Sequence, residues 1–70
     1  MNLRELLAHN LRQLRRAKGM TQEGLAWEAC LTRSQMSGIE RGVRAASVDN
    51  LETLATALGV EPVVLLQKSQ

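Results

Sequence analysis

The chain has 70 residues, a formal net charge of +2, one cysteine, one tryptophan and neither Phe nor Tyr. This length fits one domain, residues 1–70, with a thin core of small aliphatic side chains to which a second copy would add buried area. One cysteine excludes an internal disulfide, no Cys/His cluster has metal-ligand spacing, and no apolar run is long enough to span a bilayer. We therefore expect a cytoplasmic protein without a metal, cofactor or small-molecule ligand.

Positive charge is concentrated in the first two thirds of the chain. Residues 12–44 carry seven Lys and Arg side chains but only three Glu, whereas residues 45–70 carry three acidic side chains and one Lys. This asymmetry favours a protein with one basic face, as nucleic-acid binding requires. Ordinary solvated helix charges would explain so small an excess equally well.

The first half of the chain contains signals for three helices. Apolar residues at helical spacing predict a helix over residues 3–17, which Lys18 and Gly19 end. Thr21 is a suitable N-cap for a second helix that runs to about Ala29. After a short break, Thr32 and the residue three positions later form a T-x-x-Q capping box that opens a third helix over 33–41.

The second half contains signals for two more helices. Ser47 caps a fourth helix over residues 48–58, and Gly59 closes it. Pro62 stands where the first turn of a fifth helix would begin, a position at which its missing N–H costs nothing. No segment alternates with a period of two, so no strand is predicted. The expected fold class is all-α, with five short helices.

The second and third helices are spaced as a helix-turn-helix, at about residues 22–41. The helices of this motif cross closely, so the contact residue must be small, and Ala26 is. Met36 and Ile39 would bury one side of the third helix. The opposite side is polar or small and is left exposed for a DNA groove; it contains Arg33, Ser34, Ser37 and Gly38.

Several stretches resemble the Cro/C1-type (XRE-like) repressor family of lambda-repressor-like DNA-binding domains. They are GMTQEGLA at 19–26, TRSQMSGIERG at 32–42, SVDNL at 47–51 and LATALGV at 54–60. The similarity extends from about residue 7 to 66, and the small members include controller proteins of restriction–modification systems. It implies a bacterial or phage-encoded regulator, a repressor or controller, that binds palindromic operators in double-stranded DNA as a homodimer.

The chain departs from the family pattern at two positions. Cys30 stands where the turn usually has Gly, which would strain the backbone if this residue is left-handed. Gly24 replaces an acidic residue in the first turn of the second helix, which removes the capping-box partner of Thr21. Both changes should reduce stability without removing a DNA contact.

The resemblance also implies roles for individual side chains. The third helix would enter the major groove, with base contacts from Arg33, Ser34, Gln35, Ser37 and Gly38. Arg33 has the fork that matches guanine O6 and N7, although a phosphate contact or a solvated charge is the alternative. The expected phosphate contacts are Gln22, Arg41, Arg44, Asn50, Arg12 and Arg16.

Other residues are assigned structural roles. Arg15 and Glu40 occupy the positions of an Arg–Glu pair found in many family members, which predicts a salt bridge that orients the third helix. Trp27 is expected to pack against the first helix, with a partner surface as the alternative. His9 is expected at the surface, and Cys30 is interpreted as a turn residue rather than a redox switch.

The apolar C-terminal segment predicts a two-fold interface. Val60, Val63, Val64, Leu65 and Leu66 present more apolar surface than a short terminal helix needs, although they could instead cap the monomer core. In a dimer the two recognition helices would lie about 34 Å apart, one turn of DNA. An antitoxin or protein-interaction module is the competing hypothesis. An enzyme is excluded because the sequence contains no nucleophile–base set, paired carboxylates or phosphate loop.

Overall fold

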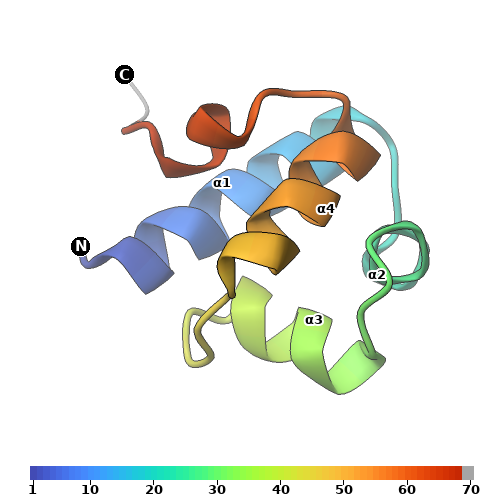
Figure 1. The fold of residues 1–70 in the computed structure, drawn as a ribbon, viewed down its shortest axis with the longest axis horizontal. Coiled ribbons are helices and arrows are strands. Elements are labelled where there is room, and N and C mark those ends of the chain that lie inside the picture. The colour runs from blue at the N-terminus through green and yellow to red at the C-terminus, as the bar shows by residue number, and fades with distance from the viewer. Residues whose placement is uncertain (69–70) are drawn as a thin grey trace.

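The computed structural model describes residues 1–68, in which four α-helices and one short 3₁₀ helix occur and no strand is present. The elements are α1 (Leu3–Ala17), α2 (Gln22–Glu28), α3 (Arg33–Glu40), α4 (Val48–Leu58) and η1 (Pro62–Leu66). Figure 1 shows α3 on the side of the molecule opposite η1, with α1 and α4 between them. The all-helical prediction is confirmed for this part of the chain.

The helix boundaries follow from local capping chemistry. The side chains of Thr21, Thr32 and Ser47 each accept a bond from the backbone N–H three residues later. Thr32 and Ser47 belong to full capping boxes, whereas Thr21 accepts only from the N–H of Gly24, which has no side chain with which to return the bond. Gly59 ends α4 with φ of +70°, the left-handed conformation that favours glycine.

The turn between α2 and α3 places Cys30 at φ of +59°. This is the only non-glycine residue with positive φ within residues 1–68. A side chain in this region meets the following carbonyl oxygen, which costs roughly 1–2 kcal/mol. The predicted strain at this turn is therefore confirmed.

The predicted fifth helix is wrong in type. Residues Pro62–Leu66 form a 3₁₀ helix, and its N-cap Glu61 makes no side-chain capping bond. Five residues are too few to offset the cost of nucleating an α-helix, and 3₁₀ geometry is common in such short pieces. Its sole buried residue is Leu65.

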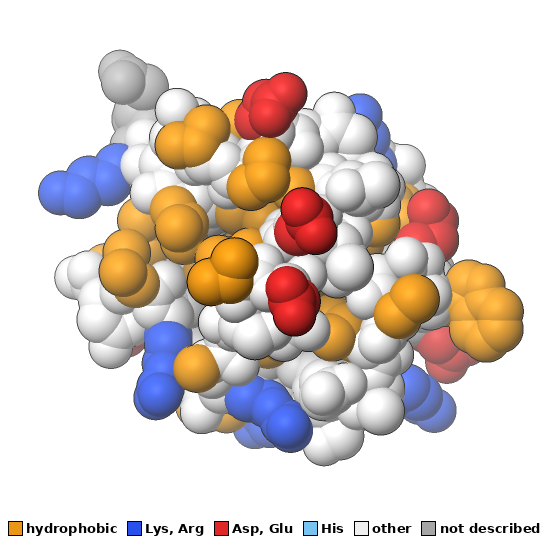
Figure 2. Space-filling model, viewed as in Figure 1, with side chains coloured by type: hydrophobic (Ala, Val, Ile, Leu, Met, Phe, Trp, Pro, Cys, Tyr) orange, Lys and Arg blue, Asp and Glu red, His pale blue; other side chains and the backbone are white. Residues whose placement is uncertain are grey.

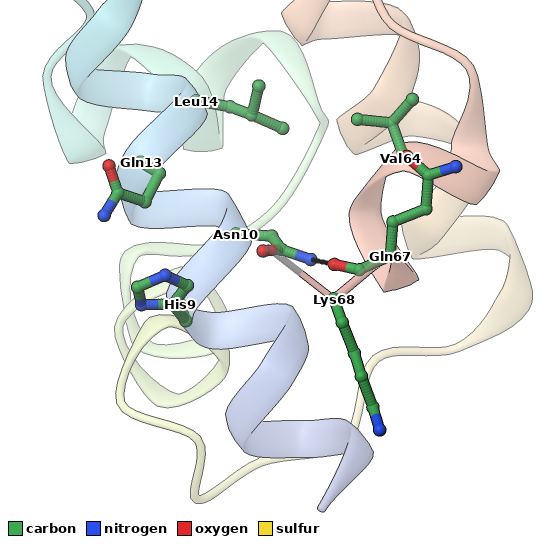
Figure 3. Close-up of a pocket in the computed structure, with 7 residues that line it drawn as sticks. All are labelled: His9, Asn10, Gln13, Leu14, Val64, Gln67 and Lys68. Carbon is green, nitrogen blue, oxygen red and sulfur yellow. Dashed lines mark hydrogen bonds between the residues drawn. The ribbon is translucent and has the colours of Figure 1, made fainter. Parts of the chain in front are cut away.

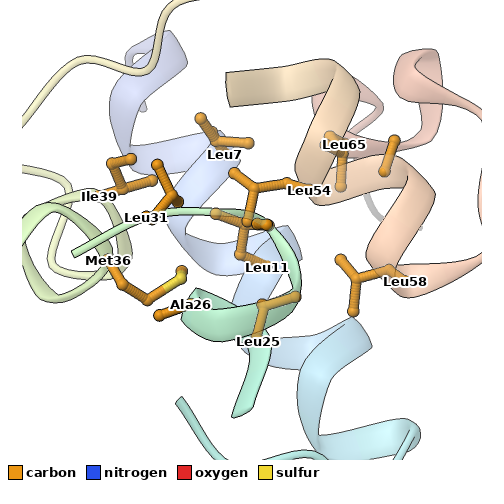
Figure 4. Packing of buried hydrophobic residues seen from close by; sticks show 12 residues of the cluster. Leu7, Leu11, Leu25, Ala26, Leu31, Met36, Ile39, Leu54, Leu58 and Leu65 are labelled. Carbon is orange, nitrogen blue, oxygen red and sulfur yellow. The ribbon is translucent and has the colours of Figure 1, made fainter. Parts of the chain in front are cut away.

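The core lies where all five elements meet. Figure 4 shows its side chains converging from α1, α2, α3, α4 and η1. The largest fully buried ones are Leu11, Leu25, Met36, Ile39, Leu54, Leu58 and Leu65. Because α1 contacts α3 and η1 while α4 contacts α2 and η1, this shared core sets the position of the helix-turn-helix.

A buried amide fastens η1 to α1. Asn10 lies on α1 and donates from Nδ2 to the carbonyl oxygens of Leu65 and Gln67, both at 2.8 Å. Figure 3 shows this side chain directed at the carbonyl of Gln67. Both residues, together with His9 and Lys68, line a hollow of about 450 Å³. Since the amide donor is used by backbone carbonyls at the end of the chain, we assign Asn10 a structural role.

Candidate nucleic-acid interface

Helices α2 and α3 pack against each other as a helix-turn-helix. Ala26 is buried at their crossing, and its carbonyl accepts from the N–H of Leu31 at 2.9 Å, which closes the turn. Met36 and Ile39 bury the inner side of α3 in the core. The small contact residue and the inward pair that the sequence predicted therefore lie where the motif requires them.

Fewer residues on the outer side of α3 are exposed than the sequence predicted. Arg33 and Ser34 are exposed and Ser37 is half-buried, and we call these three residues the recognition face. Gly38 is buried, so the prediction that it is exposed is wrong, and its base contact stays a prediction. Gln35 is half-buried, and its Oε1 accepts from the N–H of Thr32 at 2.9 Å as part of the cap.

Arg33 has an acidic neighbour that the sequence did not indicate. Its Nε lies 3.7 Å from Oε2 of Glu23, and the two side chains are 85% and 72% exposed. An ion pair this exposed is weak, so the guanidinium is free to leave it for another acceptor. Glu23 lies in the first turn of α2, which puts a negative charge beside the recognition face.

The predicted Arg15–Glu40 salt bridge is present. Arg15 Nε donates to Glu40 Oε2 at 2.7 Å and Nη2 donates to Oε1 at 3.1 Å, so the contact is bidentate. The side chains are only 14% and 3% exposed. Arg15 also donates to the carbonyl of Met20 at 3.0 Å. The pair therefore joins α1 to the last residue of α3.

Two further side chains join this ion pair. Gln22 donates from Nε2 to Glu40 Oε1 at 3.2 Å, and Arg12 Nη1 donates to the backbone carbonyl of Glu40. Because an ionised carboxylate only accepts hydrogen bonds, it fixes which end of the Gln22 amide points inward. Arg12 satisfies a carbonyl that the C-terminus of α3 would leave free. The sequence offered no signal for either bond, since the partners are distant along the chain.

The remaining cations that were predicted to contact phosphate lie at the surface. Arg16, Arg41 and Arg44 are exposed, whereas Asn50 uses Oδ1 to cap α4. In Figure 2 Lys and Arg side chains lie along the edge where α3 and the loop after it run, and acidic side chains lie over α4. This segregation agrees with the basic face expected from the charge distribution.

Two predictions for apolar residues are wrong. Trp27 is 85% exposed on α2 and does not pack against α1. Leu65 is fully buried in the monomer core, because the 3₁₀ turn points this side chain between α1 and α4, and so it cannot lie in a dimer interface. Val60 and Val64 are half-buried, while Val63 and Leu66 are exposed. His9 is half-buried and Cys30 is exposed.

Other classes of site find little support in residues 1–68. No three His, Cys, Asp or Glu side chains of this part are grouped to hold a metal ion. None of its helices is both long and apolar enough to cross a membrane.

Residues 6–67 match the family described as helix-turn-helix domain. The chain belongs to this family. It is 48% identical over 66 residues to the control protein C.BamHI of Bacillus amyloliquefaciens, across 93% of this chain and 82% of the relative. It is 41% identical over 66 residues to an uncharacterized helix-turn-helix transcriptional regulator of Sinorhizobium fredii, across 94% of this chain and 86% of that protein.

Solved structures agree with these relationships. The restriction–modification controller protein C.AhdI from Aeromonas hydrophila superposes with a TM-score of 0.85 at 47% identity, over 89% of this chain and 94% of that one. The hypothetical transcription factor NHTF from Neisseria superposes with a TM-score of 0.94 at 40% identity, over 99% and 79% of the two chains. The chain is a DNA-binding transcriptional regulator of the helix-turn-helix type.

Proposed function

We propose that this protein is a sequence-specific regulator that binds palindromic operators as a homodimer, in the manner of a restriction–modification controller. The observation that carries the proposal is the recognition face, which is polar, has Arg33 and Ser34 exposed, and lies on a helix that the Arg15–Glu40 ion pair joins to α1. The similarity to two controller proteins over nearly the whole chain supports the subfamily. Such a regulator acts in the cytoplasm by binding alone, without a chemical step.

Base recognition in this proposal comes from α3. Arg33 is expected to contribute most, because a guanidinium can donate two parallel hydrogen bonds to guanine O6 and N7. Such a contact is worth about 1–3 kcal/mol of discrimination between bases. Ser34 and Ser37 lie beside it on the same helix, and Gln35 contributes at the edge through its amide Nε2. Moving Arg33 from Glu23 to a base exchanges a weak exposed ion pair for a bidentate bond.

Phosphate contacts would fix the position of α3 on the duplex. Gln22 can donate its second Nε2 hydrogen to a phosphate while Glu40 holds the first. The exposed Arg41 and Arg44 follow α3, and further candidates are Asn50, Arg16 and the remaining donors of Arg12. Each neutralised phosphate should steepen the salt dependence by about 0.9 in log–log slope.

The proposed dimer surface consists of Leu3, Leu51, Val63 and Leu66. Leu3, Leu51 and Leu66 line one hollow of about 210 Å³. Val63 lies three residues before Leu66 on η1, and in a 3₁₀ helix residues at this spacing lie one above the other. Figure 2 shows apolar side chains gathered on this part of the molecule, where the start of α1, α4 and η1 meet. Burying them would enlarge a core that lacks aromatic side chains.

The dimer is tested by a matched pair of substitutions. Val63 and Val43 are equally exposed, at 61% and 63%, but only Val63 belongs to the dimer surface. Analytical ultracentrifugation without DNA should give a dimer for the parent and for Val43→Asp and a monomer for Val63→Asp. A monomeric parent, or equal behaviour of the two variants, would refute the assignment of this surface.

DNA recognition is tested by selection from a pool of random duplex DNA. The expected result is an inverted repeat whose half-sites are about one helical turn apart. Selection with Arg33→Ala should lose the preference at one base pair of each half-site, whereas Arg16→Ala should weaken binding and retain the same sequence. Folded parent protein that enriches no sequence at low salt would favour the antitoxin or protein-interaction hypothesis.

A further inference from the structure

Gly38 occupies an unfavourable position for a glycine. It lies inside α3, an eight-residue helix, where its backbone freedom opposes helix formation. Its φ is not positive, so the backbone conformation does not require glycine. A packing reason is therefore needed for the absence of a side chain.

That reason is the side chain of Arg44. A Cβ atom added to Gly38 would lie 2.9 Å from Arg44 Cβ, 3.2 Å from Cδ and 3.7 Å from Cγ. The aliphatic stem of Arg44 thus lies flat on α3 in the space that a side chain at position 38 would occupy. This contact explains why Gly38 is buried although it stands on the outer side of the helix.

The backbone of the following loop is tied to the same residue. The N–H groups of Val43 and Arg44 both donate to the carbonyl of Gly38, at 3.1 and 3.2 Å. Any shift of Arg44 Cβ away from position 38 must therefore strain or break these two bonds. The loop after α3 and the stem of Arg44 form one ordered unit that rests on Gly38.

The guanidinium of Arg44 forms neither an ion pair nor a hydrogen bond with any of residues 1–68. Positions 34 and 38 share one side of α3 because they are four residues apart. Since Cβ, Cγ and Cδ of Arg44 cover position 38, the stem of Arg44 lies on the side of α3 that holds Ser34. A long side chain ordered before binding loses less rotamer entropy when it meets its ligand.

We propose that Gly38 is a positioning residue, which orders Arg44 along α3 so that its guanidinium is placed in advance for the DNA phosphate. The inference rests on the proposed function, because it takes Arg44 as a DNA contact. In this proposal Gly38 acts on DNA through Arg44, and not through the direct base contact that the family resemblance implied.

The test compares Gly38→Ala, Arg44→Ala and the double variant on the selected operator over a range of salt concentrations. Fluorescence anisotropy of labelled duplex should show that Gly38→Ala weakens binding several-fold and lowers the salt slope by about 0.9, as the loss of one phosphate contact does. Arg44→Ala should give the same slope, and the double variant should bind no more weakly than Arg44→Ala. Gly24→Ala adds the same methyl group to α2 and should leave the slope unchanged.

Thermal unfolding separates this role from a loss of fold. Gly38→Ala should melt within a few degrees of the parent, because the gain in helix propensity opposes the cost of moving the loop. If it does not fold, adding Arg44→Gly, which removes the atom that the new methyl group meets, should restore folding. Failure of that combined variant to fold would overturn the proposal.

The outcomes distinguish this inference from the proposed function. A parent that binds no duplex would overturn both. Normal binding by Arg44→Ala would remove Arg44 from the interface and this inference with it, while the other DNA contacts stand. Weak binding by Arg44→Ala with unchanged affinity and slope for Gly38→Ala would overturn the role of Gly38 alone.

Discussion

Replacing Glu40 with Ala should strongly destabilise this protein, because it removes the carboxylate that pairs with the largely buried guanidinium of Arg15. The substitution removes both guanidinium bonds, at 2.7 and 3.1 Å, and leaves the charge of Arg15 with an exposure of only 14%. Removing one partner of a buried pair costs about 3–5 kcal/mol. Arg15 keeps its bond to the carbonyl of Met20, so we expect the lower end, about 3 kcal/mol.

A loss of this size is large for so small a domain. A stability of about 0.05–0.15 kcal/mol per residue gives a total of roughly 3.5–10 kcal/mol for a chain of this length. At about 4–8 °C for each kcal/mol, the midpoint of thermal unfolding should fall by roughly 12–24 °C. Far-ultraviolet circular dichroism measures this directly, and urea titration gives the free energy of unfolding.

Glu23→Ala is the matched control, because it breaks an Arg–Glu pair that is exposed on both sides. Its expected cost is below about 1 kcal/mol. The reasoning fails if Glu40→Ala loses no more stability than this control. It also fails if the effects of Arg15→Ala and Glu40→Ala are additive in the double variant, since paired residues should be strongly non-additive.

Three further predictions test other parts of the structure. Cys30→Gly should raise the free energy of unfolding by about 0.5–1 kcal/mol, because glycine relieves the positive φ at some cost in chain entropy; an unchanged or lower midpoint would contradict the strain. Leu65→Ala should cost about 2–5 kcal/mol in urea titration, whereas Leu66→Ala should cost far less, and equal losses would refute the burial difference. Glu23→Gln should raise affinity for duplex DNA in anisotropy titrations, since it removes a negative charge beside Arg33; weaker binding would count against this placement.

The starts of α2, α3 and α4 and the ends of α1 and α4 were predictable because their signals are local. Thr32 needs only the N–H and the side chain three residues away to form its capping box, and Gly59 needs only its own backbone freedom. These interactions depend on residue order and not on the surroundings. The Arg15–Glu40 pair was also predicted, but from resemblance to a family and not from spacing.

The side-chain contacts at the candidate DNA interface were less predictable. From its place beside Ser37 on the helix, Gly38 was predicted to be an exposed small residue. In the folded chain the loop after α3 places the side chain of Arg44 over it. The bond from Gln22 to Glu40 and the approach of Glu23 to Arg33 each join residues that only the folded α2–α3 pair brings together. No local pattern encodes such contacts.

The sequence by itself determined where helices begin and which of their sides are apolar, since these depend on interactions within a turn or two of chain. It also indicated a helix-turn-helix, through the spacing of two such helices. Only the tertiary structure decided which side chains of the apolar C-terminal segment are buried. Its residues have similar side chains, but the 3₁₀ turn buries Leu65 between α1 and α4 and leaves Val63 exposed. Burial there depends on the direction of approach of a segment to a distant core, and that direction is set by packing.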